Sequence, residues 1–207
     1  MKEENPEPDI LEYKIITLGD PAVGKTSIIK RFLNEKFDPN ELSTLGMSYT
    51  NKIIKVNEVN IKLNLVDTAG QEKFRAISLS YLRHTDVVLF IFDLNRENSF
   101  EGIQYWIDLF NENEGFDKLK GKYLVGNKND LEQNVNQNLI DDLVQNNNFT
   151  YISTSAKTKN QIDEMFQFIG EELYEYDKKN KTKGSTQKGK VLSQRNNNKG
   201  QCCQILF

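Results

Sequence analysis

The stretch Gly19–Thr26, Gly-Asp-Pro-Ala-Val-Gly-Lys-Thr, constrains the fold of this chain more than any other feature. It matches the phosphate-loop pattern of glycine, four free positions and then Gly-Lys-Ser/Thr. An apolar run, Tyr13–Leu18, precedes the loop, and apolar residues at helical spacing follow it over Thr26–Asn34. A strand that turns sharply into a helix aims backbone N–H groups and a helix N-terminus at one point, which attracts phosphate. The alternative is a chance match in a glycine-containing loop.

Three residues of this loop have predicted chemical roles. Gly24 allows close backbone approach, because a Cβ at this position would intrude. Lys25 supplies a positive charge for the β- and γ-phosphates, and the Thr26 hydroxyl is a candidate Mg²⁺ ligand. The loop therefore predicts a nucleotide site that also holds magnesium.

Strands and helices alternate along the rest of the chain. Strand character covers residues 47–56, 59–65, 86–93, 122–126 and 150–152, and helical spacing covers about 98–110, 136–145 and 162–173. The turn Asn57-Glu58 makes the first two runs a hairpin, and Asn98 or Ser99 is the expected cap of the middle helix. The pattern predicts an α/β fold of the P-loop NTPase type, with a doubly wound, mostly parallel six-stranded sheet, one antiparallel strand and about five helices.

Charge divides the chain into unequal parts. Residues 1–11 are expected to be flexible, residues 12–177 to form the nucleotide-binding domain, and residues 178–207 to form a disordered basic tail. The tail carries eight basic residues and no acidic residue, whereas the first 177 residues carry 19 basic and 30 acidic residues. An acidic domain with a basic tail excludes a nucleic-acid-binding body and suits an anionic membrane surface; a merely solvated tail is the alternative.

Cysteine and histidine usage narrows the setting. The two cysteines, Cys202 and Cys203, are adjacent, so they do not form a disulfide framework, and a reducing cytosolic setting is expected. The single histidine, His84, is expected on the surface and offers no zinc site. The sequence has no run of 18 apolar residues and no apolar core of a signal peptide near its start.

Polar motifs follow the predicted strands. Asp67 ends a strand beside the phosphate loop, where a carboxylate can hold Mg²⁺ directly or through water. The backbone N–H of Gly70 can reach a γ-phosphate, and the Gln71 amide can orient an attacking water. Alone, Asp67 would be a turn cap and Gln71 a surface residue.

Asn127-Lys128-Asn129-Asp130 follows a later strand and predicts the base specificity. The Asp130 carboxylate can accept hydrogen bonds from N1–H and the 2-amino group of guanine, and adenine lacks both donors in that arrangement. Asn127 can tie neighbouring loops together, the Lys128 stem can lie over the base, and Ala156 can present its N–H to guanine O6.

Together these residues resemble the Ras superfamily of small GTPases over about residues 12–176. Five motifs match in order and spacing: Gly19–Thr26, Thr44, Asp67–Gln71, Asn127–Asp130 and Thr154–Lys157. Within the superfamily the chain looks like a Rab. Rab switch segments are similar to Ser43–Gly46, Gln71–Arg75 and Ser80–Arg83, and a double geranylgeranyl site is similar to Cys202-Cys203.

The resemblance implies roles for individual residues. Thr44 is the switch I ligand of magnesium and γ-phosphate, and Phe37 packs edge-on against the guanine. The implied catalytic residues are Gln71, Lys25 and Thr44, and the implied metal ligands are Thr26, Thr44 and Asp67. The implied nucleotide contacts are Asp20, Pro21, Ala22, Val23, Gly24, Lys25, Thr26, Ser27, Phe37, Thr44, Gly70, Asn127, Lys128, Asp130, Ser155, Ala156 and Lys157.

The implied function is that of a membrane-anchored GTP/GDP switch with Mg²⁺ in vesicle trafficking, on the cytoplasmic face of intracellular membranes. We identify no arginine in the chain that supplies transition-state charge in cis, so slow hydrolysis and an activating protein are expected. The other implied partners are an exchange factor, a GDP-dissociation inhibitor or escort protein, and effectors that contact switch I and switch II. The nucleotide-binding domain is expected to be monomeric and to bind no nucleic acid.

Several positions depart from the Rab pattern. Pro21 and Ala22 replace the usual small residues such as Ser and Gly, and proline fixes φ and removes an N–H. Glu41 stands where many relatives carry an aromatic residue. Val66 replaces a tryptophan, Met47-Ser48-Tyr49 departs from the usual effector sequence, and four residues follow the last cysteine.

Two other function classes fit parts of the sequence. The first is another phosphate-loop phosphohydrolase or kinase, which Asn127–Asp130 disfavours. The second is a guanine-nucleotide-binding module that cycles poorly, which Pro21 favours. Competition between GTP and ATP and a single-turnover assay separate these classes.

Overall fold

The computed structural model describes residues 10–41, 44, 46–68 and 80–196, with side chains as far as Asn180. Its six strands are β1 Leu11–Leu18, β2 Met47–Val56, β3 Val59–Thr68, β4 Val87–Asp93, β5 Gly121–Asn127 and β6 Thr150–Ser153. Its five α-helices within these residues are α1 Lys25–Phe32, α3 Glu97–Glu101, α4 Ile103–Asn113, α5 Gln137–Asn147 and α6 Ile162–Asn196, with a 3-10 turn η2 at Phe116–Lys118. The predicted fold class is confirmed.

The six strands form one sheet in the order β2-β3-β1-β4-β5-β6. Only β2 and β3 pair antiparallel, as the predicted hairpin requires, and the other neighbours are parallel. Parallel strands direct their carboxyl ends to the same edge of the sheet, where ligands bind in folds of this kind.

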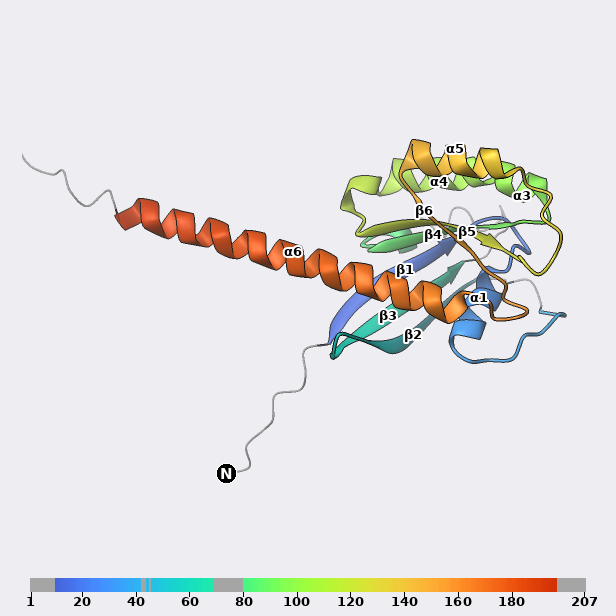
Figure 1. Ribbon diagram of the computed structural model, residues 1–207, viewed down its shortest axis with the longest axis horizontal. Helices are drawn as coiled ribbons and strands as arrows, with labels where there is room; N and C mark the ends of the chain where they lie inside the picture. Colours follow the sequence, from blue (N-terminus) through green and yellow to red (C-terminus); the bar gives the residue numbers. More distant parts are fainter. Residues whose placement is uncertain (1–9, 42–43, 45, 69–79, 197–207) are drawn as a thin grey trace, which may run out of the picture.

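Helices cover both faces of the sheet (Figure 1). Alternate residues of β4 face opposite cores: Val87, Leu89 and Ile91 pack with α1 and α6, and Val88, Phe90 and Phe92 pack with α4 and α5. All of them are fully buried, as expected for a central parallel strand. This rigid sandwich fixes the loops at the carboxyl edge.

Two predicted helix boundaries are wrong. The middle helix is two helices, α3 and α4, separated at Gly102, where an added Cβ would lie 2.6 Å from the Asp20 carboxylate. Its N-cap is Arg96 rather than Asn98 or Ser99. Ser99 is buried inside α3, where its hydroxyl bonds to the backbone of the preceding turn. Burial and tertiary contacts outweighed the local capping preference.

The last helix is longer than its apolar spacing predicted. Among the described side chains of α6, which end at Asn180, the last buried apolar one is Leu173. The helix continues to Asn196 and extends beyond the sheet (Figure 1). The structure continues α6 through residues 178–196, where the sequence predicted a disordered basic tail, and that prediction stays a prediction. Residues 162–196 contain no proline, and lysine and glutamine are good helix formers. Apolar periodicity marks where a helix is buried, not where it ends.

Candidate functional site

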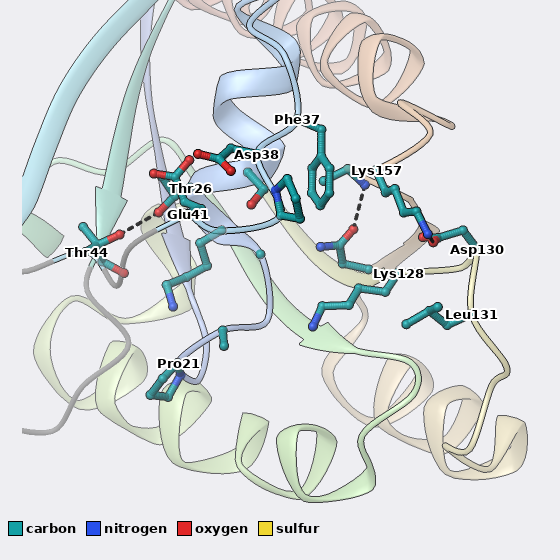
Figure 2. A pocket seen from close by; sticks show the side chains of 18 residues that line it. Pro21, Thr26, Phe37, Asp38, Glu41, Thr44, Lys128, Asp130, Leu131 and Lys157 are labelled. Atoms are coloured by element: carbon teal, nitrogen blue, oxygen red, sulfur yellow. Dashed lines mark hydrogen bonds and ion pairs between the residues drawn. The ribbon is translucent and has the colours of Figure 1, made fainter.

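A cavity of about 480 Å³ lies at the carboxyl edge of the sheet. Figure 2 shows Pro21 and Thr44 at one end of it and Asp130 and Leu131 at the other. Its lining residues are Pro21, Ala22, Gly24, Lys25, Thr26, Ser27, Phe37, Asp38, Pro39, Glu41, Thr44, Thr68, Asn127, Lys128, Asp130, Leu131, Ala156 and Lys157. The structure thus brings residues from five separate sequence motifs to one cavity.

Two glycines allow the phosphate loop its path. Gly19 has φ +148°, and an added Cβ would lie 2.1 Å from the backbone oxygen of Ile91. Gly24 has φ +100°, and an added Cβ would lie 2.2 Å from Nδ2 of Asn127. Both positions are therefore restricted to glycine by backbone conformation and by space. The loop is packed against β4 on one side and the Asn127 segment on the other.

The Lys25 side chain crosses the inside of the loop. Its Nζ donates to the backbone oxygens of Gly19, at 2.8 Å, and Asp20, at 2.9 Å. Burial lowers the pKa of Lys25 to about 8, while the nearby charges of Asp67 and Asp20 oppose this shift. An anionic ligand favours the charged form of a lysine, so it would raise a pKa that burial has lowered.

Three oxygen-bearing side chains converge at the end of the cavity near Thr44. Thr26 Oγ1 donates to Asp67 Oδ2 at 2.7 Å. The same hydroxyl oxygen lies 2.7 Å from Thr44 Oγ1 (Figure 2). The other Asp67 oxygen, Oδ1, is buried without a hydrogen-bond partner among the described residues, and burial raises the pKa of this carboxyl. An unpartnered buried carboxylate oxygen is costly unless a cation or donor satisfies it. These residues fit Mg²⁺, which prefers oxygen ligands and takes few from protein.

The Asn127 side chain joins three loops at the base end. Its Nδ2 donates to the Val23 backbone oxygen at 2.8 Å, and its Oδ1 accepts from Thr154 Oγ1 at 3.3 Å and from Ala156 N at 3.2 Å. The prediction that Asn127 ties neighbouring loops is therefore confirmed. The Ala156 N–H that was predicted to face guanine O6 donates to Asn127 here.

Asp130 is held at the far end of the cavity. Its Oδ1 accepts from Ser155 Oγ at 2.6 Å, and its Oδ2 lies 3.5 Å from Lys157 Nζ. The carboxylate side chain is only 13% exposed, so a ligand that cannot donate to it would leave it poorly solvated. Lys128 Nζ is paired with Asp93 Oδ2 at 2.6 Å, which stretches the lysine stem along the cavity.

Comparison with known proteins agrees with this geometry. Residues 14–175 match the family model described as "Ras family". The chain belongs to the Ras family. It is 35% identical over 163 residues to Ras-related protein Rab-2B of Dictyostelium discoideum, covering 78% of this chain and 80% of that protein. It is 33% identical over 165 residues to Ras-related protein Rab-13 of Bos taurus, covering 78% and 79%, respectively.

A yeast relative extends the same picture. The chain is 35% identical over 171 residues to GTP-binding protein YPT53 of Saccharomyces cerevisiae (strain ATCC 204508 / S288c), covering 79% of this chain and 77% of that protein. This chain is accordingly a Ras-family small GTPase of the Rab type and a GTP-hydrolysing enzyme.

The predicted nucleotide contacts of this GTPase divide by position. The Asp20, Val23 and Ser155 side chains do not line the cavity: Asp20 accepts from Trp106 Nε1 at 2.9 Å, Val23 is fully buried, and Ser155 supports Asp130. Gly70, Gln71, Cys202 and Cys203 lie outside the described residues, so their predicted roles stay predictions. The other predicted contacts line the cavity.

Sequence reasoning missed two charged contacts of the GTPase site. Lys30 Nζ lies 2.8 Å from each carboxylate oxygen of Glu41, which pins the cavity-lining segment before Thr44 to α1. Arg96 Nη2 donates to the Pro21 backbone oxygen at 2.7 Å. The sequence signals were Glu41 at a usually aromatic position and Arg96 in the segment after β4. Neither residue indicates from sequence alone which residue it contacts.

Proposed function

We propose that this Rab-type GTPase binds GTP and GDP with Mg²⁺, hydrolyses GTP slowly and acts as a membrane-anchored switch in vesicle trafficking. The observation that carries the proposal is the arrangement of one cavity. The cavity is lined by the phosphate loop and by the shielded carboxylate of Asp130. Thr26 in its lining donates to Asp67, a buried carboxylate whose other oxygen has no partner among the described residues. These are the three groups that a guanine nucleotide with magnesium requires.

Each described residue has a defined task in this proposal. Lys25 leaves the two loop carbonyls that it now holds and binds β- and γ-phosphate oxygens. Thr26, Thr44 and Asp67 hold Mg²⁺, which when bound neutralises charge on the phosphates. Asp130 accepts from the guanine edge, and Asn127 keeps the base loop and the phosphate loop together. Gln71, which lies outside the described residues, would orient the attacking water.

Switching follows from the place of Thr44. Its hydroxyl lies beside Thr26, so γ-phosphate and Mg²⁺ would hold switch I, about residues 35–46, while Gly70 would hold switch II, about residues 68–83. Loss of the γ-phosphate releases both segments. An exchange factor, an activating protein, a GDP-dissociation inhibitor or escort protein, and effectors would read this change.

Membrane attachment is proposed through the tail. Prenylation of Cys202 and Cys203, with the eight basic residues from Lys178 onward, would place the GTPase on the cytoplasmic face of intracellular membranes. Two chains give stable anchoring where one does not. Among the described residues, no helix has the length and apolar character needed to cross a bilayer. A tail with one modified cysteine or none is the alternative.

A single-turnover assay tests the proposal. The full-length protein is stripped of nucleotide, reloaded with GTP and Mg²⁺, and followed by chromatography. We expect copurified guanine nucleotide and conversion to GDP over minutes to hours. Absence of guanine nucleotide would refute the proposal, and tight GTP that is never converted, even with an activating protein, would favour the poorly cycling binding module.

The variant Gln71→Leu tests whether Gln71 orients the attacking water. Gln71→Leu removes the amide but keeps a side chain of similar length, so GTP binding should persist while the single-turnover rate falls by about tenfold or more. An unchanged rate in this variant would remove Gln71 from the mechanism.

A further inference from the structure

We infer that Arg96 is a positioning residue of the phosphate loop, which sets the Pro21–Ala22 peptide for phosphate binding. The inference rests on the proposed function and concerns the same cavity. Arg96 Nη2 donates to the Pro21 backbone oxygen at 2.7 Å, although the two residues are 75 positions apart in the chain. Arginine donates from a rigid planar fork, so it can hold a carbonyl in a defined direction.

The backbone of Arg96 is itself firmly held. Arg96 comes after Leu94 and Asn95, which follow the last residue of β4, and its N–H donates to the backbone oxygen of that last residue, Asp93, at 3.0 Å. The Arg96 backbone oxygen accepts from the hydroxyl of the buried Ser99 at 2.7 Å. The exposed guanidinium therefore extends from a turn whose main chain is bonded on both sides.

The same segment contacts the neighbouring residue of the loop. Trp106 Nε1 in α4 donates to Asp20 Oδ1 at 2.9 Å. Gly102, at the start of α4, lies so close to Asp20 that an added Cβ would come within 2.6 Å of its carboxylate. Residues 96–106 thus brace two consecutive residues of the phosphate loop, one through its side chain and one through its backbone.

The direction of the Pro21 carbonyl matters because of peptide geometry. In a trans peptide the C=O of one residue and the N–H of the next point in opposite directions. A Pro21 carbonyl held toward Arg96 therefore turns the Ala22 N–H away from Arg96, at a loop position that lines the cavity. Ala22 has φ 60°, a left-handed conformation that residues other than glycine rarely adopt. A clamp on the preceding carbonyl helps to keep it there.

Arg96 also adds charge at this end of the cavity. Its guanidinium contacts the backbone of Pro21, which lines the cavity. The positive charge should be felt by phosphate groups more than by a base that Asp130 reads, because Pro21 and Asp130 lie at opposite ends of the cavity (Figure 2).

The test compares two ligands on full-length, nucleotide-stripped protein with Mg²⁺. Affinities for GDP and for guanosine are measured by calorimetric titration on wild type, Arg96→Ala and Arg96→Gln. Arg96→Ala should weaken GDP about tenfold and leave guanosine unchanged, since only the phosphates use the positioned loop. Arg96→Gln keeps a donor for the Pro21 carbonyl, so it should recover most of the GDP affinity.

A control variant tests whether loss of any positive charge has the same effect, and three results would overturn the inference. Lys118→Gln removes one positive charge from an exposed residue of η2 and should leave both affinities unchanged. Equal GDP affinity in Arg96→Ala and wild type, or equal weakening of GDP and guanosine, would overturn the inference. If Arg96→Gln bound GDP no more tightly than Arg96→Ala, the inference would also be overturned. The charge of Arg96 would then act alone, and its hydrogen bond to the Pro21 carbonyl would not position the loop. Failure of wild type to bind GDP would instead refute the proposed function.

Discussion

The two ends of the nucleotide cavity are prepared in different ways. At the base end, Asn127, Asp130 and Lys128 each have protein partners, at 2.6 to 3.5 Å. At the phosphate end, Asp67 Oδ1 is buried without a partner among the described residues, and Lys25 has only loop carbonyls as hydrogen-bond acceptors. The base end is organised by the protein, whereas the phosphate end keeps polar groups that a ligand must satisfy.

This difference has an energetic consequence. Groups that are already oriented lose little entropy when a ligand arrives, so the base end can contribute specificity. Buried groups without partners gain most from a ligand that pairs with them, so the phosphate end can contribute affinity and sense which phosphates are present. Under the proposed function, base recognition and switching would therefore be separated within one cavity.

The largest expected effect comes from changing the base end. Asp130→Asn replaces an acceptor that pairs with two donors of guanine by an amide with one acceptor and one donor. GTP affinity should fall by about 30-fold or more, since an unpaired buried polar group costs about 1 to 3 kcal/mol and a charged one costs more. Xanthosine triphosphate, which carries an oxygen in place of the 2-amino group, should gain affinity.

Competition of GTP and xanthosine triphosphate against a fluorescent guanine nucleotide measures this exchange. Asp163→Asn, an exposed aspartate of α6, is the matched control and should leave the preference for GTP intact. An Asp130→Asn protein that still prefers GTP would show that the base is not read by Asp130.

The phosphate end should respond to pH. Lys25 has a pKa of about 8 in the absence of ligand, and bound phosphates favour its charged form. Raising the pH from 7 to 9 removes the proton from the free protein but not from the complex. The GDP dissociation constant should therefore rise above pH 8, approaching about tenfold per pH unit.

Guanosine serves as the reference ligand for this pH series. It has the same base, so ionisation of the base affects both ligands equally, but it has no phosphate. Parallel pH curves for GDP and guanosine would contradict a role for the Lys25 ammonium in phosphate binding.

Local sequence patterns predicted the scaffold of this site well. The phosphate loop and the hairpin follow from short-range rules, because strand and helix ends are encoded in neighbouring residues. The position of Asp67 beside Thr26, 41 positions away in the chain, follows instead from the rule that parallel strands bring their carboxyl ends to one edge of the sheet. The Asn127 contacts could also be predicted, since that residue type follows a parallel strand whose carboxyl end meets the phosphate loop.

Side-chain contacts that no sequence motif indicates could not be predicted from those rules. The Arg96–Pro21 and Lys128–Asp93 contacts join residues 75 and 35 positions apart, and nothing in an isolated arginine or aspartate names its partner. The break at Gly102, a residue that lies close to the Asp20 carboxylate, was also missed. Three-dimensional packing, not local propensity, determines these features.

The smallest expected effect concerns the Lys30–Glu41 pair. Both side chains are partly exposed, so the pair itself is worth about 1 kcal/mol or less. Lys30→Met leaves Glu41 as an unpaired anion on a cavity meant for phosphates, and GDP dissociation should accelerate up to about fivefold. Glu41→Gln should change the rate less, because it removes the repelling charge together with the pair.

The double variant Lys30→Met/Glu41→Gln decides between two explanations. If Lys30 acts by holding Glu41 away from the phosphates, the double variant should dissociate GDP at the rate of Glu41→Gln alone. If the two residues act independently, their effects on the rate should multiply. Stopped-flow release of a fluorescent GDP separates these results, and multiplication would mean that Glu41 is tolerated at this usually aromatic position without help from Lys30.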